Sequence, residues 1–122
     1  MNLYSKNIGK TFSGVNVLRS VNFSLEPGEV HALVGENGAG KSTFVKVLSG
    51  VYTPTIGNIY LDDQKVQINT PIAAQKNGIS LIHQEPQSFS HLSVAENIFM
   101  GHMDGSNFSR VKWKNINKSS EK

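Results

Sequence analysis

One stretch, residues 30–43, constrains this chain more than any other, because it joins a predicted strand, a glycine-rich loop and a predicted helix. Residues 30–34 are largely apolar and lack polar alternation, which predicts a strand buried on both faces. The next eight residues are Gly35-Glu36-Asn37-Gly38-Ala39-Gly40-Lys41-Ser42 and fit the pattern G-x-x-x-x-G-K-[ST]. Apolar residues then recur at helical spacing, at positions 44, 47, 48 and 51. This order of elements favours a site for nucleotide phosphates.

Phosphate chemistry explains the residue types in this loop. Glycines let the backbone approach a polyanion closely, and successive amide N–H groups should point into one concavity at the positive end of the helix dipole. Lys41 is expected to place its ammonium between the β- and γ-phosphates, and Ser42 to offer its hydroxyl to Mg²⁺. The predicted phosphate-binding residues are Gly35, Asn37, Gly38, Ala39, Gly40, Lys41, Ser42 and Thr43. The alternative is a glycine-rich turn with an exposed lysine.

The composition of the chain limits its expected location, its chemistry and its binding partners. A chain of 122 residues corresponds to about one small domain, and 38% hydrophobic and 17% charged residues are ordinary for a soluble protein. No run is long enough to span a membrane, so we expect a cytoplasmic or peripheral location. The chain has no cysteine, which excludes disulfides, thiolate metal sites and cysteine nucleophiles. Residues 110–122 carry a charge of +4 and the rest of the chain −1, which sum to the net charge of +3, so we expect no nucleic-acid partner.

Alternating patterns predict an antiparallel region before the loop and a hairpin after it. Residues 2–25 are predicted to form the antiparallel region, with turn signals at Gly9 and Ser13-Gly14. Pro27-Gly28 predicts a tight turn that separates this region from the strand predicted at residues 30–34. Residues 59–68 predict a β-hairpin, with Asp62-Asp63-Gln64-Lys65 at its tip. The two aspartates resemble a metal-and-water site at a strand end, but a second alternating strand follows at once. A hairpin tip is therefore the preferred interpretation.

Local signals also predict two short helices and a further strand. Thr70-Pro71 is typical of a helix start, and Asn77-Gly78 of a helix end. Residues 79–82 predict a second buried strand. Ser93-Val94-Ala95-Glu96 forms a capping box, whose helix should run to about Met100 and stop at Gly101. The four histidines have no metal-ligand spacing and are expected to serve packing or the surface.

Three segments together resemble the ATPase domain of ABC transporters. They are residues 35–43, the run Ile82-His83-Gln84-Glu85, and the run Leu92-Ser93-Val94-Ala95-Glu96-Asn97-Ile98. More narrowly, they look like the ATP-binding subunits of bacterial monosaccharide importers of the ribose, galactose, xylose and arabinose type. The resemblance implies an α/β fold, the N-terminal half of a P-loop NTPase (RecA-like) core with an antiparallel β subdomain. It covers residues 1–101, and 102–122 would be a loop and basic tail at the start of the helical subdomain.

The resemblance also implies roles for residues outside the loop, with ATP and Mg²⁺ as ligands. Phe12 matches the aromatic residue that stacks on adenine, with Val17 beside the base or ribose; an ordinary core aromatic is the alternative for Phe12. Gln84 matches the glutamine that senses Mg²⁺ and the γ-phosphate, which makes it a catalytic and metal-binding candidate alongside Lys41 and Ser42. Residues 84–87 would approach the membrane permease. The other implied partners are a second nucleotide-binding domain and, indirectly, a periplasmic sugar-binding protein.

Several family motifs do not occur in the 122 residues. These are the Leu-Ser-Gly-Gly-Gln signature, the Mg²⁺-binding aspartate, the catalytic glutamate and the switch histidine. We therefore expect the chain to be the N-terminal part of a longer, membrane-associated ATPase for sugar import. On its own, it should bind Mg²⁺·ATP and turn it over negligibly. The alternatives are another P-loop NTPase such as a GTPase, a non-catalytic nucleotide-binding or interaction module, and a DNA-repair ATPase head.

Overall fold

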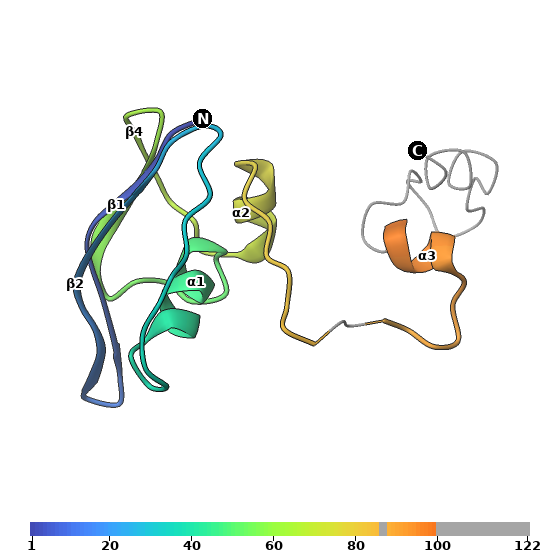
Figure 1. The fold of residues 1–122 in the computed structure, drawn as a ribbon, viewed down its shortest axis with the longest axis horizontal. Helices are drawn as coiled ribbons and strands as arrows, with labels where there is room; N and C mark the ends of the chain where they lie inside the picture. Colours follow the sequence, from blue (N-terminus) through green and yellow to red (C-terminus); the bar gives the residue numbers. More distant parts are fainter. Residues whose placement is uncertain (86–87, 100–122) are drawn as a thin grey trace. The chain divides into compact units, whose positions relative to one another are not determined.

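The computed structural model describes residues 1–85 and 88–99, in two compact units (Figure 1). The first unit is Met1–Leu81, and the second begins at Ile82. The predicted helix end at residues 100–101, the predicted tail at 102–122 and positions 86–87 lie outside the described residues. Within the described part of the chain, no helix has the length and apolarity needed to cross a membrane.

A four-stranded antiparallel sheet, with strand order β2-β1-β3-β4, forms the first unit. Its strands are β1 (Leu3–Phe12), β2 (Val15–Leu25), β3 (Ile56–Leu61) and β4 (Gln64–Val66). Phe12 pairs with Val15 in the first hairpin, and Tyr4 pairs with Tyr60 between β1 and β3. This confirms the antiparallel region predicted over residues 2–25 and the hairpin predicted over 59–68.

Two-residue turns close both hairpins. The backbone is left-handed at Ser13 and Gly14 (φ 46° and 81°) and at Asp62 and Asp63 (φ 46° and 64°). Positive φ at both central residues matches the right-handed twist of the flanking strands. Asp62 and Asp63 are therefore turn residues, as predicted. Gly9 is not a turn residue, however, because it lies inside β1.

The glycine at position 9 serves close packing instead. A Cβ there would lie 2.5 Å from Cγ1 of Ile56, so glycine leaves room for the Ile56 side chain of β3 against β1. The Gly9 carbonyl also accepts a hydrogen bond of 2.8 Å from the Thr55 amide. Turn glycines and close-approach glycines look alike in a sequence, which explains the wrong prediction.

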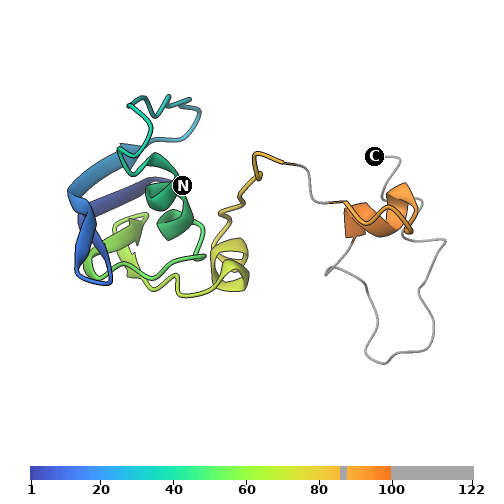
Figure 2. The ribbon, with the colours of Figure 1, turned by 90° about the horizontal axis from the view of Figure 1, so that it is seen from below.

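Two short helices complete the first unit. Helix α1 (Lys41–Leu48) buries Phe44 and Val47 against the sheet, and Figure 2 shows it beside the strands. Val51, predicted on the same helical face, lies beyond the helix and is 41% exposed. Helix α2 (Pro71–Lys76) begins as predicted, since the Thr70 hydroxyl accepts a hydrogen bond of 3.1 Å from the Ala73 amide. The core consists of Leu3, Ile8, Leu18, Phe44, Val47, Ile59, Leu61, Ile68 and Ala74.

The two predicted buried strands, residues 30–34 and 79–82, do not form. Val30 and Val34 are 97% and 90% exposed, and Ile82 is 94% exposed. A strand buried on both faces needs neighbouring strands for its backbone groups and other elements to cover its side chains. No strand among the described residues pairs with either segment. These two predictions are wrong for the described chain.

The second unit contains helix α3 (Val94–Phe99), which begins with the predicted capping box. The Ser93 amide donates to the Glu96 carboxylate at 2.7 Å, and the Glu96 amide donates to the Ser93 hydroxyl at 3.3 Å. The Asn97 side chain adds further bonds, accepting from the Phe89 amide at 2.8 Å and donating to the carbonyls of Phe89 and Ser93. This helix is therefore tied to the loop that precedes it.

The capping box predicts a pH dependence of α3. The hydrogen bond from the Ser93 amide lowers the pKa of Glu96, which stabilises the ionised form in the folded state. The contribution of this hydrogen bond to the stability of α3 is fully present above the unfolded glutamate pKa of about 4.3. It is lost as pH falls through the lower pKa of the folded state. We expect exchange protection of the Ser93 amide, measured by NMR, to fall in that acidic range. Glu96→Gln should remove this dependence, and an unchanged pH profile in that variant would contradict the assignment.

Candidate nucleotide-binding site

The glycine-rich loop leads directly into α1. Lys41 is the first helical residue, and Gly40 caps the helix with a left-handed backbone (φ 94°). The Phe44 amide donates to the Gly40 carbonyl at 2.9 Å, and the Ala39 amide donates to the Glu36 carbonyl at 3.1 Å. Residues 35–39 are exposed. The loop thus presents accessible backbone at a helix N-terminus, which is the geometry that suits an anion.

Gly40 also packs the loop against the sheet. A Cβ at this position would lie 2.8 Å from Cδ2 of Leu18 and 3.1 Å from the Val17 carbonyl oxygen. Because the φ of Gly40 is positive as well, another residue would be strained there and would crowd Leu18 and the Val17 carbonyl. The structure therefore brings Val17 next to the loop, while its contact with a base or ribose remains a prediction.

Lys41 folds back over its own loop. Its ammonium donates to the carbonyl oxygens of Gly35 and Glu36, the latter at 2.8 Å. A Cβ at Gly35 would lie 3.2 Å from the Ala39 Cβ and 3.7 Å from Cδ of Lys41, so glycine makes room for this conformation. Both acceptors are exposed backbone groups. Phosphate oxygens would replace them as acceptors at little cost, because charged acceptors bind an ammonium more strongly.

Phe12 lies at the end of β1 and contacts residues that the sequence did not indicate. Its ring meets the Tyr52 ring edge to face, with 5.1 Å between centres, and Nζ of Lys10 lies 5.0 Å from its centre. Tyr52 follows the C-terminal end of α1, whereas the loop precedes the N-terminal end. The contact with Lys10 could have been predicted from the sequence, because residues two apart on a strand share a face. The contact with Tyr52 could not.

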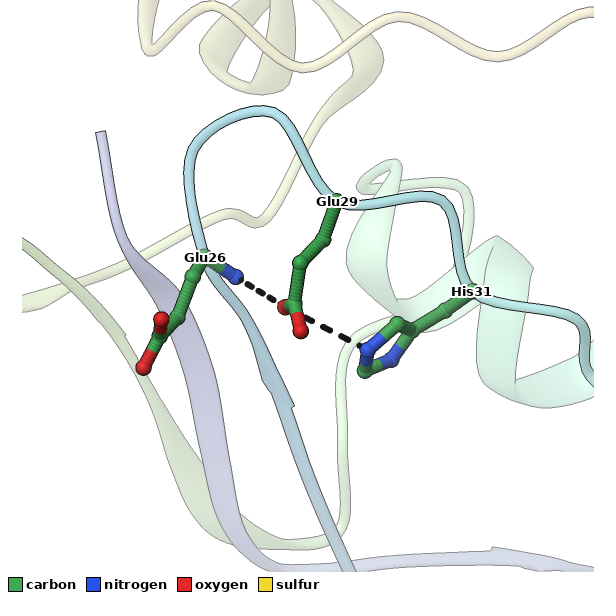
Figure 3. Close-up of polar contacts among 3 residues, drawn as sticks. All are labelled: Glu26, Glu29 and His31. Carbon is green, nitrogen blue, oxygen red and sulfur yellow. Dashed lines mark hydrogen bonds and ion pairs between the residues drawn. The ribbon is translucent and has the colours of Figure 1, made fainter.

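The segment between β2 and the loop turns sharply before it reaches the site. Pro27 and Gly28 form the predicted tight turn, in which the Glu29 amide donates to the Glu26 carbonyl at 3.1 Å. Figure 3 shows the Glu29 carboxylate between the Glu26 amide, 2.7 Å away, and Nε2 of His31, 3.3 Å away. The Glu26 amide is the main cause of the lowered pKa of Glu29. These contacts fix where the chain leaves the sheet for the loop.

The remaining predicted ligands are accessible. Ser42 is exposed and Thr43 half-buried on the first turn of α1. Gln84 is exposed in the second unit, so its predicted roles in catalysis and Mg²⁺ binding stay predictions. Among the described residues, no three His, Asp or Glu side chains gather as a metal site.

A comparison with protein families gives a match over most of the chain. The family model described as "ABC transporter" matches residues 18–122. The chain belongs to the ABC transporter family. In this family context, the exposed loop, the folded-back Lys41 and the antiparallel sheet form the N-terminal part of a P-loop NTPase fold, as predicted from the motifs.

Curated relatives within the family are import proteins. The chain is 50% identical over 112 residues to the ribose import ATP-binding protein RbsA 1 of Rhizobium meliloti, covering 92% of this chain and 22% of the relative. It is 56% identical over 94 residues to a putative ribose/galactose/methyl galactoside import ATP-binding protein of Burkholderia cenocepacia, covering 77% and 18%. The chain thus spans about a fifth of the length of these relatives.

Solved structures of the same class share the fold. The ADP conformation of an ATP-binding cassette of an ABC transporter matches with a TM-score of 0.74 and 31% identity, over 83% of this chain and 40% of the cassette. A nucleotide-free ATP-binding cassette matches with a TM-score of 0.76 and 28% identity, over 97% and 46%. The sheet and helices described above therefore correspond to part of such a cassette.

Proposed function

We propose that residues 35–43 bind the phosphates of Mg²⁺·ATP, and that the whole protein hydrolyses ATP to drive import of ribose or a related sugar. The observation that carries the proposal is the exposed loop at the N-terminus of α1, with the Lys41 ammonium held on two exchangeable carbonyls. The names of the relatives, ribose and ribose/galactose import ATP-binding proteins, support the sugar.

Each predicted residue has a defined task in this proposal. Loop amides and Lys41 hold the β- and γ-phosphates, and the charge of Lys41 offsets the charge that develops during phosphoryl transfer. Ser42 and Gln84 would supply oxygen ligands to Mg²⁺, whose chemical contribution is to neutralise phosphate charge. Phe12 stacks on adenine, and Val17 contacts the base or ribose next to Gly40.

Proposed partners follow from the import function. A membrane permease would contact residues 84–87, and a second nucleotide-binding domain would complete the site from outside this chain. A periplasmic sugar-binding protein would act indirectly. The protein would accordingly be peripheral on the cytoplasmic face of the membrane. The import proteins among the relatives support this arrangement.

Titration with nucleotides tests the binding step. Calorimetry with Mg²⁺·ATP, Mg²⁺·GTP and Mg²⁺·tripolyphosphate should show binding of all three, because the loop recognises phosphate. ATP should bind more tightly than tripolyphosphate, because base stacking contributes about 1–3 kcal/mol. A clear preference for GTP would contradict adenine stacking and favour another P-loop NTPase. The absence of binding by all three would contradict the phosphate site itself.

A further inference from the structure

Lys10 joins two segments of the first unit, strand β1 and residues 52–53, through one ammonium group. Its Nζ donates a hydrogen bond of 2.7 Å to the carbonyl of Thr53, which follows α1. The same Nζ lies 5.0 Å from the centre of the Phe12 ring and 5.9 Å from that of Tyr52. The two rings touch each other edge to face. A single cation thus contacts both aromatic residues and the backbone behind them.

The exposure of Phe12 argues against a purely structural cluster. Phe12 keeps 37% of its surface exposed, whereas Phe44 in the core keeps 3%. A ring that only filled the core would be covered like Phe44. An aromatic ring that is held by neighbours and still accessible is instead suited to stack on a planar ligand, because little side-chain entropy is lost on binding.

We infer that Lys10 is a positioning residue for the base of the bound nucleotide, acting through the Phe12 ring. This inference rests on the proposed function, in which Phe12 stacks on adenine. The hydrogen bond to Thr53 fixes the ammonium, and the fixed ammonium restricts the Phe12 ring by cation–π attraction. Lys10 itself needs no contact with the nucleotide.

The expected effect is modest and specific to the base. A cation–π contact at an exposed site corresponds to about a twofold to fivefold change in a binding constant. Lys10→Met should weaken Mg²⁺·ATP binding by about this factor and leave Mg²⁺·tripolyphosphate binding unchanged, since tripolyphosphate has no base. Lys10→Arg should restore ATP affinity, because it keeps a cation and a hydrogen-bond donor.

The chain offers a matched control in Lys6. This lysine lies on the same strand, and its Nζ is 5.6 Å from the centres of the stacked Tyr4 and Tyr60 rings. Lys6→Met therefore removes a comparable cation–π contact on β1 away from Phe12. This variant should change neither the affinity for Mg²⁺·ATP nor the affinity for Mg²⁺·tripolyphosphate.

A double-mutant cycle with Phe12→Ala, measured by calorimetry on the purified protein, decides the question. Lys10→Met should have no further effect on ATP affinity once the Phe12 ring is gone. An equal loss of tripolyphosphate affinity, or a Lys10→Met effect that persists without the ring, would overturn the inference and leave the proposed function intact. If the unmodified protein binds neither ligand, the proposed function fails and this inference fails with it.

Discussion

Lys41→Met is expected to weaken Mg²⁺·ATP binding by about 10-fold to 100-fold, because hydrogen bonds to charged groups contribute about 1.5–3 kcal/mol. The side chain keeps its length and loses its charge. Among the described residues, the ammonium donates hydrogen bonds to the exposed carbonyls of Gly35 and Glu36, so the substitution should change stability little. Calorimetric titration and thermal unfolding of the same samples measure both quantities.

Lys76→Met is the control for this experiment. Lys76 is an exposed lysine in the last turn of α2, in the same unit, and the substitution removes an equal charge. It should leave ATP affinity unchanged. Equal losses in both variants would mean that general electrostatic attraction binds the nucleotide. Unfolding of the Lys41→Met protein would mean that Lys41 stabilises the loop, contrary to the exposed geometry.

Gly57→Ala is expected to destabilise the first unit by about 3 kcal/mol or more. Gly57 lies in β3 with φ 92°, and a Cβ there would be 2.4 Å from the Asn7 carbonyl oxygen and 2.6 Å from that of Lys6. The left-handed backbone alone costs a non-glycine residue about 1–2 kcal/mol. The clash adds to this cost, because the atoms that would have to move belong to the backbone of β1, which pairs with β3.

Gly14→Ala separates the cost of the left-handed backbone from the cost of the clash with β1. Gly14 has a similar φ of 81°, but nothing lies within 4 Å of the Cβ position. This variant should therefore show the conformational cost alone, about 1–2 kcal/mol. Chemical denaturation of both variants gives the difference in unfolding free energy. Equal destabilisation would show that the close approach of β1 and β3 is unimportant.

Sequence reasoning succeeded where structure depends on neighbouring residues. The N-cap at Thr70, the Ser93–Glu96 capping box and the aspartate turn at the hairpin tip are all set by side chains within four positions. The local sequence contains every donor and acceptor that these caps and turns need. The strand predicted at 30–34 depends instead on partners elsewhere, and apolar residues alone do not supply them.

The same distinction between local and long-range determinants applies to the residues of the candidate site. The phosphate loop is a contiguous motif, so its residues and the start of α1 at Lys41 follow from the sequence. The contact of Phe12 with Tyr52 joins β1 to the segment after α1, and only the fold brings these two residues together. Equally, the need for glycine at position 40 arises from Leu18 on β2, which local spacing does not reveal.

The order of strands in the sheet has a consequence for how the protein folds. The hairpins β1–β2 and β3–β4 each close over two residues, and such hairpins form in about 1–10 μs. Pairing of β1 with β3 must first close residues 13–55 into a loop, which makes it the slower, non-local step. The phosphate loop and α1 both lie within that segment. A ligand that binds this segment only in the folded protein would therefore stabilise the paired state by mass action.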